Sequence, residues 1–233
     1  GLGEDGTYQD LRSETPSYLR YDISVPQHRS TGGIDKFTRD PDPDTDFLVS
    51  SAARYPSAES FRADLRRSFL MLPVADREAL IYVHGFNNTF DEGILRISQL
   101  SDDFHLDGVA LHYSWPSAAS PLGYEYDKDS VLFARDGLED LIRQVRAAGA
   151  QRVLLVGHSM GGSVAIALAL RHPEMVSHLV VGEGNLTPGG GIATQHFASF
   201  SAKDFAENEL PRVLAGRRAA AIEGDPQALV AVV

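Results

Sequence analysis

The sequence contains no cysteine, which excludes disulfide frameworks, thiolate metal sites and cysteine nucleophiles. This absence leaves the compartment open, because a chain without cysteine is insensitive to redox conditions. Basic residues are also scarce, since 21 lysines and arginines against 32 acidic residues give a formal net charge of −11. Such a charge repels phosphate backbones and anionic lipid. We therefore expect neither nucleic acid as a partner nor stable insertion into a membrane.

Long apolar runs are missing as well. The stretch SVAIALAL at 163–170 is far shorter than a membrane span, and no signal-peptide pattern opens the chain. We expect a soluble protein, either cytoplasmic or exported. The first residue is Gly1, so a processed chain or a fragment is expected. A length of 233 residues with 43% hydrophobic residues is typical of one domain with one substantial core.

Within this single domain, three stretches differ in pattern. Residues 1–76 contain two runs of alternating apolar and polar residues, typical of antiparallel strands, and then a helical pattern from Ser57 to Pro73. Residues 77–184 alternate apolar strands with helices, one of them spanning about 129–148 and ending at Gly149. Such alternation predicts an α/β fold with a mostly parallel sheet covered on both faces. Residues 185–233 are interpreted as a loop with helices, a candidate lid region.

The sequence Gly157-His158-Ser159-Met160-Gly161 fits the pattern G-x-S-x-G. It stands between an apolar strand and an apolar helix, where this motif forms a sharp turn that exposes the serine hydroxyl. The glycines allow the backbone to pass without a Cβ clash. Ser159 is therefore our candidate nucleophile.

Acyl transfer also requires hydrogen-bond donors for the oxyanion that develops on the substrate. In this arrangement one donor is the backbone N–H of the residue after the nucleophile, here Met160. The second comes from the loop after an earlier strand, and Phe86, which follows His84-Gly85, occupies that place. Both loops follow parallel strands at their carboxyl ends, where open sheets bind ligands.

Several segments resemble one known family. They are the HGFN loop at 84–87, the SWPS strand end at 114–117, the YEYDKD segment at 124–129 and the HSMG turn at 158–161. Over roughly residues 20–165 the chain resembles the bacterial α/β-hydrolase family catalogued as a domain of unknown function, DUF900. The resemblance implies an α/β-hydrolase fold and esterase-like or lipase-like activity, with Ser159 as nucleophile and Phe86 and Met160 as oxyanion donors. The segment EGNLTPGGG at 183–191 instead resembles other α/β-hydrolases.

A serine nucleophile needs a base, and in this fold the order along the chain is serine, acid, histidine. His172 closes the helix after the turn, and His178 precedes a strand and so lies at the wrong end of the sheet. His196 is the remaining candidate, although nothing around it indicates a turn after a final strand. Glu183 is the best candidate acid, because it follows an apolar strand. Two alternatives are a chain that ends before its histidine and a protein that keeps the fold without the full triad.

Other polar residues near these motifs have plainer interpretations. His158 cannot turn back onto the neighbouring hydroxyl and is expected to pack and hydrogen-bond at the edge of the pocket. His84 is expected to brace the oxyanion loop, and Trp115 to line the acyl pocket or pack in the core. The tyrosines and aspartates of the segment at 124–129, which includes Asp127, could shape a pocket, but a solvated start of a helix is the preferred interpretation.

The function predicted is therefore a serine hydrolase that cleaves an ester or related acyl compound, a small molecule, through an acyl-enzyme. The chemistry requires no metal and no organic cofactor. The alternative is a hydrolase-fold protein that binds a ligand without turnover, because the histidine of the triad is not evident in the sequence.

Overall fold

The computed structural model describes residues 15–29, 31–32, 41–120 and 123–183. The chain divides into two compact units, Gly1–Gly184 and Asn185–Val233, and all described residues belong to the first. The loop and helices expected at 185–233 lie outside the described residues. None of the described helices is both long enough and apolar enough to cross a membrane.

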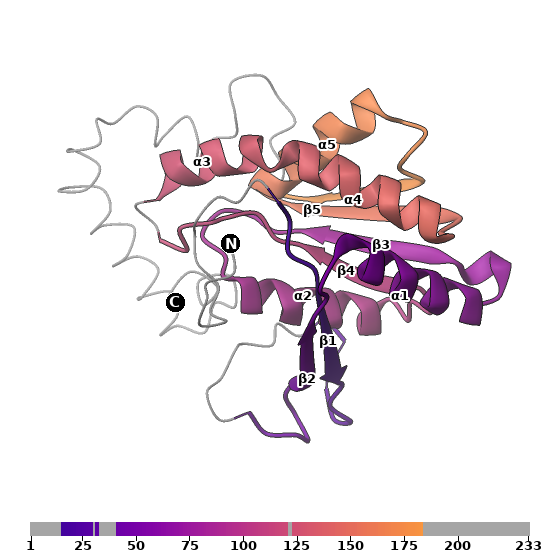
Figure 1. The fold of residues 1–233 in the computed structure, drawn as a ribbon. Helices are drawn as coiled ribbons and strands as arrows, with labels where there is room; N and C mark the ends of the chain where they lie inside the picture. Colours follow the sequence, from indigo (N-terminus) through magenta and orange to yellow (C-terminus); the bar gives the residue numbers. More distant parts are fainter. Residues whose placement is uncertain (1–14, 30, 33–40, 121–122, 184–233) are drawn as a thin grey trace. The chain divides into compact units, whose positions relative to one another are not determined.

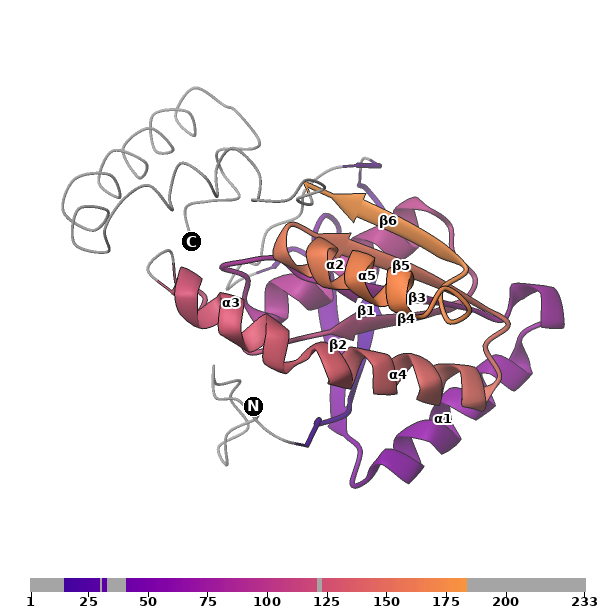
Figure 2. The same ribbon diagram turned by 90° about the horizontal axis from the view of Figure 1, so that it is seen from above.

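Four parallel strands form the central sheet in the order β4-β3-β5-β6, which can be followed in Figures 1 and 2. Their bounds are Glu78–Val83 for β3, Val109–Tyr113 for β4, Arg152–His158 for β5 and His178–Gly182 for β6. In the register, Ile81 of β3 lies between Leu111 of β4 and Leu155 of β5. The parallel sheet predicted from the apolar runs is confirmed, and β3 and β5 lie at its centre.

Helices cover both faces of this sheet. One face packs against α1 (Ala58–Met71), α4 (Arg135–Ala148) and α5 (Met160–Arg171), and the other against α2 (Phe90–Asp103). Alternate residues of each strand face opposite sides, as a pleated strand requires. The larger core contains Ala79, Ile81, Val83, Val153 and Leu155 of the strands, and the smaller one contains Leu80, Tyr82 and Val156.

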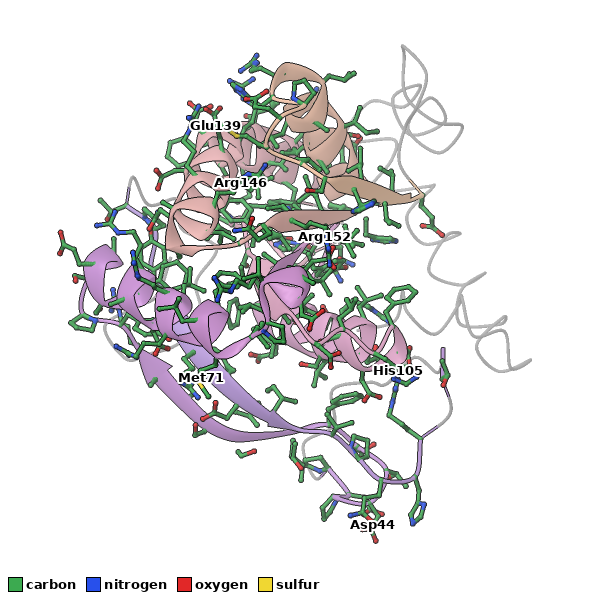
Figure 3. The ribbon with its side chains drawn as sticks, turned by 90° about the vertical axis from the view of Figure 1, so that its right-hand side faces the viewer. Asp44, Met71, His105, Glu139, Arg146 and Arg152 are labelled. Carbon is green, nitrogen blue, oxygen red and sulfur yellow. The ribbon has the colours of Figure 1, made fainter. Side chains whose placement is uncertain are left out.

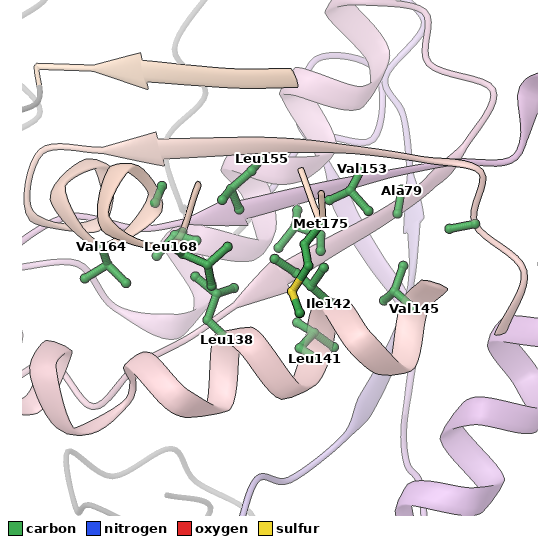
Figure 4. Packing of buried hydrophobic residues seen from close by; sticks show 14 of the residues in the cluster. Ala79, Leu138, Leu141, Ile142, Val145, Val153, Leu155, Val164, Leu168 and Met175 are labelled. Atoms are coloured by element: carbon green, nitrogen blue, oxygen red, sulfur yellow. The ribbon is translucent and has the colours of Figure 1, made fainter. Parts of the chain in front are cut away.

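The larger core is formed mainly between the sheet and α4. Leu138 and Ile142 of α4 are fully buried under Val153 and Leu155 of β5 (Figure 4). Burying an aliphatic side chain of this size stabilises a fold by about 1.5–3 kcal/mol. The strand that ends at the candidate nucleophile therefore rests on a well-packed layer.

Two helices begin with reciprocal capping. The hydroxyl of Ser57 accepts the N–H of Ser60 at the start of α1, which ends just before Pro73 and a 3-10 turn, Val74–Asp76. At the start of α2, Thr89 Oγ1 accepts the N–H of Glu92 at 3.2 Å, and the Glu92 carboxylate accepts the N–H of Thr89 at 2.7 Å. These bonds satisfy N–H groups that have no partner within the helix.

The helix expected over 129–148 is instead two helices, α3 (Tyr124–Phe133) and α4. The interruption falls at Ala134, whose carbonyl oxygen accepts a hydrogen bond from the hydroxyl of Tyr113 on β4. The hydroxyl reaches this carbonyl because Gly137 has no side chain: a Cβ there would lie 2.6 Å from the oxygen of Tyr113. The end of α4 at Gly149 agrees with the prediction, and this glycine has a φ of 124°.

The two N-terminal strands form a sheet of their own. Strands β1 (Leu19–Ser24) and β2 (Leu48–Arg54) pair in the antiparallel direction that their alternating pattern predicted. The ring of Tyr18 stacks on Phe61 of α1 at 4.4 Å. Arg29 binds Asp102 of α2 at 2.5 Å. The hairpin is therefore held by contacts with two helices, while Asp44 lies in the exposed turn before β2 (Figure 3).

Candidate functional site

The candidate nucleophile occupies a strained turn between β5 and α5. Ser159 has φ 50° and ψ −116°, a backbone conformation that a residue with a side chain adopts at an energetic cost. Its N–H donates to the carbonyl oxygen of Gly182, the last residue of β6, at 2.7 Å. Strained backbone of this kind concentrates at functional sites, and the turn has the arrangement of a nucleophile elbow.

The turn at Ser159 and the loop after β3 touch each other through their backbones. A Cβ at Gly161 would lie 2.4 Å from the carbonyl oxygen of Val83 and 2.3 Å from that of His84. A Cβ at Gly85 would lie 3.1 Å from the Cβ of Ser159. A side chain at Gly161 would clash with backbone atoms, so glycine is required there, and a side chain at Gly85 would fit only if His158 and Ser159 shifted. The nucleophile turn thus lies directly against the loop that was expected to supply an oxyanion donor.

Both expected oxyanion donors lie beside this contact. Met160 is the first residue of α5, where backbone N–H groups have no partner within the helix and carry its positive dipole end. Phe86 directly follows Gly85, and its ring meets the ring of Tyr124 on α3 edge-on, with centroids 5.4 Å apart. Two N–H groups at the carboxyl ends of neighbouring strands can hold one developing negative charge.

His84, expected to brace the oxyanion loop, and Trp115, expected to line the acyl pocket or pack in the core, are both buried, with 1% and 2% of their surface exposed. Their rings stack at 4.5 Å, and Trp115 Nε1 donates to the carbonyl oxygen of His84 at 2.9 Å. Burial lowers the pKa of His84 to about 4, so its ring is neutral at pH 7. Nδ1 lies 2.9 Å from the carbonyl oxygen of Gly85, and Nε2 lies 3.1 Å from the carbonyl oxygen and 3.2 Å from the backbone nitrogen of Trp115. The ring therefore links the loop after β3 to the segment after β4, and His84 braces the loop.

His158 faces Glu183 across the ends of β5 and β6. Its Nε2 lies 3.4 Å from Glu183 Oε2, and a Cβ at Gly85 would lie 2.8 Å from its Nδ1. Burial lowers the pKa of His158, and the nearby carboxylate of Glu183 acts in the opposite direction. Glu183 follows β6 directly, with φ 53° and an exposed side chain. The carboxylate expected to serve as the acid therefore has His158 as its partner in the described part of the chain.

No histidine of the described ranges hydrogen-bonds to the hydroxyl of Ser159. His172 caps the end of α5, and its Nε2 lies 3.2 Å from Glu139 of α4, which is labelled in Figure 3. His178 begins β6, at the opposite end of the strand from the elbow. The candidate base, His196, lies outside the described residues. Among the residues that are described, no group of three or more potential metal ligands comes together.

Asp127 is a site residue whose environment the sequence interpretation missed. It was expected at the solvated start of a helix, but α3 begins three residues earlier and the side chain is fully buried. Its carboxylate accepts hydrogen bonds from Ser117 Oγ at 2.7 Å and from the N–H groups of Ala118 at 2.6 Å and Asn87 at 3.3 Å. The spacing in the sequence could have indicated this burial, because Asp127 lies four residues before the buried Val131 and so shares its face of the helix.

Comparison with known proteins agrees with this arrangement. Residues 58–178, just over half of the chain, match the family described as "Alpha/beta hydrolase of unknown function (DUF900)". Epoxide hydrolase 3 of Xenopus tropicalis is 29% identical over 102 residues, which is 44% of this chain and 26% of that protein. A putative carbamate hydrolase, RutD of Caulobacter sp. (strain K31), is 41% identical over 46 residues, 20% of this chain and 17% of that protein.

RutD of Klebsiella pneumoniae (strain 342), also a putative carbamate hydrolase, is 38% identical over 69 residues, covering 30% of this chain and 24% of that protein. The chain thus aligns with about a quarter or less of the length of these relatives. The family match is broader, and it includes the loop after β3, the segment after β4 and the turn at Ser159. The chain belongs to the α/β-hydrolase family DUF900.

Proposed function

We propose that this chain is a serine hydrolase that cleaves an ester or related acyl compound, a small molecule, through an acyl-enzyme on Ser159. The observation that carries the proposal is the strained turn at Ser159, packed without intervening side chains against the loop of Gly85. Membership in an α/β-hydrolase family supports the same reaction class.

In the proposed reaction, Ser159 Oγ attacks the acyl carbon while a base takes its proton. The N–H groups of Phe86 and Met160 stabilise the oxyanion, and the loss of one such donor costs about 10²–10³ in kcat. The bond to the alcohol then breaks, and the alcohol leaves with the proton from the base. Water releases the acid in a second round of the same steps. His196 as base and Glu183 as acid complete the proposed triad, and no step uses a metal or an organic cofactor.

A second candidate function is ligand binding without turnover. It is favoured by the hydroxyl of Ser159, which no histidine of the described ranges contacts, and by His158, which faces Glu183 instead. A nucleophile without its base retains only a small part of the rate that a complete triad provides. The two functions therefore differ in turnover, whereas the fold and the elbow are common to both.

Labelling with a fluorophosphonate probe tests the nucleophile. We expect mass spectrometry to find the adduct on Ser159, no adduct in Ser159→Ala, and wild-type labelling in Ser163→Ala, which removes a hydroxyl from the next turn of α5. Hydrolysis of p-nitrophenyl acetate should fall by about 10³-fold or more in Ser159→Ala. Folded protein that is not labelled, or that is labelled elsewhere, would contradict the proposal.

Substitution of the candidate base separates the two functions. If His196 is the base, His196→Ala should lower p-nitrophenyl ester hydrolysis by about 10³-fold or more while ester binding persists. His178→Ala is the matched control, because it replaces an exposed histidine at the far end of β6. A p-nitrophenyl carbamate belongs in the substrate panel, because two of the relatives are named as putative carbamate hydrolases. Binding of esters without turnover in the wild type would favour the second function.

A further inference from the structure

We propose that Asp127 is a positioning residue that holds the oxyanion loop in the geometry required for attack by Ser159. This inference rests on the proposed serine hydrolase function and assigns a task to a buried charge that the reaction itself does not use. The hydrogen bonds that the Asp127 carboxylate accepts come from Asn87, Ser117 and Ala118, none of which belongs to the turn at Ser159. Asp127 acts through the backbone of Asn87, the residue directly after Phe86.

The carboxylate of Asp127 joins three segments of the chain. It belongs to the first turns of α3, it accepts the N–H of Asn87 in the loop after β3, and it accepts two donors from the segment after β4. Those two donors are Ser117 Oγ and the N–H of Ala118. A hydrogen bond to a charged acceptor contributes about 1.5–3 kcal/mol, and a buried carboxylate requires several of them. The position of one loop is therefore tied to the position of the other.

The loop needs such support because its backbone is not in a relaxed conformation. Asn87 has φ 56°, in the left-handed region, which asparagine tolerates better than most residues but still at a cost. A residue in this region persists when its surroundings hold it there. The bond from its N–H to Asp127 provides that restraint.

Both peptide groups around Phe86 are held by side chains, one from the same loop and one from α3. In the first, the carbonyl oxygen of Gly85 lies 2.9 Å from His84 Nδ1, so the N–H of Phe86, on the same peptide plane, must point the opposite way. In the second, the N–H of Asn87 bonds to Asp127. The N–H of Phe86, which the proposed reaction requires as a donor, thus belongs to a residue with both neighbouring peptide groups fixed. Asp127 fixes the second of these peptide groups.

The first turns of α3 contact the same loop a second time. The ring of Tyr124, three residues before Asp127, meets the ring of Phe86 edge-on. Helix α3 therefore touches the side chain of Phe86 and the backbone that follows it. If the carboxylate only stabilised the two loops, its loss would leave kcat of the folded protein unchanged. If it positions the loop for catalysis, its loss lowers kcat, so kcat distinguishes the two roles.

The test compares two substitutions in the same cluster. Asp127→Asn replaces the carboxylate that holds the N–H of Asn87. We expect kcat for p-nitrophenyl acetate to fall about 10²-fold in this variant, with KM changed by less than about threefold. The reason is that misplacement of a catalytic group by about 1 Å costs a factor of this size in rate. Ser117→Ala removes one donor but leaves the bond to Asn87 intact, so its kcat should stay within about threefold of the wild type.

A second measurement uses the wild-type protein and does not depend on how well the variants fold. Hydrogen exchange resolved to single residues should show the Asn87 amide protected, because its N–H is bound by a buried carboxylate. An Asn87 amide that exchanges as fast as an exposed loop amide would overturn the proposal. So would folded Asp127→Asn with the kcat of the wild type, or a loss of kcat that Ser117→Ala reproduces. A wild type that neither labels nor turns over would instead contradict the serine hydrolase function itself.

Discussion

Two buried histidines, His84 directly after β3 and His112 on the neighbouring strand β4, differ in how their polar nitrogens are accommodated. The rings of His84 and His112 lie 5.4 Å apart, and the first is satisfied on both nitrogens by the loops it braces. The ring of His112 packs between Tyr82 and Phe90, and neither of its buried nitrogens has a hydrogen-bond partner in the described structure. Burial lowers its pKa well below the ordinary value, so one N–H of the neutral ring is left unpaired. An unpaired buried donor costs about 1–3 kcal/mol.

Substitution by leucine should therefore change the free energy of unfolding in opposite directions at the two positions. We expect His112→Leu to raise the free energy of unfolding at pH 7 by about 1 kcal/mol, because it removes an unsatisfied donor and keeps an apolar group of similar size. We expect His84→Leu to lower it by about 2–4 kcal/mol, because the N–H of Trp115 and the carbonyl of Gly85 lose their partner. Urea unfolding measures both. Equal losses in the two variants would contradict this account.

At the scale of helices and strands, the elements predicted from the sequence are those with local signals. The strands of the central sheet, the stop of α4 at Gly149 and the position of Ser159 between β5 and α5 all follow from short patterns. The break between α3 and α4 does not, because it arises from the hydroxyl of Tyr113 and the small size of Gly137.

In the candidate site, too, some residues can be located from local sequence patterns, whereas others depend on the tertiary structure. Ser159, Met160 and Phe86 can be located from their motifs, because each is defined by its immediate neighbours along the chain. The partners of Asp127 lie in two other loops, 9, 10 and 40 residues away, so their meeting depends on how the sheet brings those loops together. Hydrophobic spacing could have indicated that Asp127 is buried, but not which groups it would bind.

The start of α2 offers a prediction at this scale. Thr89→Ala removes the hydroxyl that accepts the N–H of Glu92, directly after the oxyanion loop. Loss of an N-cap of this kind costs about 1 kcal/mol, so the free energy of unfolding should fall by about that amount. Ser98→Ala on the same helix removes a hydroxyl that bonds only to the carbonyl of Ile94 and should change stability by less than about 0.5 kcal/mol. Chemical denaturation of both variants gives the comparison, and an unchanged Thr89→Ala would rule out the capping role.

For the whole molecule, the buried histidines make stability depend on pH. The unfolded chain binds a proton on His84 near the ordinary pKa of 6.5, whereas the folded protein binds it only at about pH 4. Between these values the unfolded state holds more protons, so stability falls as the pH is lowered. The contribution of His84 approaches about 3 kcal/mol near pH 4, and His112 adds a loss of the same sign.

Urea unfolding between about pH 7 and pH 4.5 measures this dependence. We expect a steady loss of stability on acidification that becomes smaller in His112→Leu. The exposed His178 supplies the control, because His178→Gln should keep the dependence of the wild type. Stability that stays constant over this range would contradict the assignment of both rings as neutral and buried.

The close packing of Gly161 against Val83 and His84, and of Gly85 against His158 and Ser159, has a consequence for how this protein can change in evolution. The loop after β3 packs closely against the turn at Ser159, so the sheet sets how near the two segments lie, while the side chains of His84 and Asp127 orient the rest of the loop. Under the proposed function, residues away from this contact can be exchanged while the contact itself persists. New substrate specificities can then arise while Ser159 and the loop after β3 keep their places.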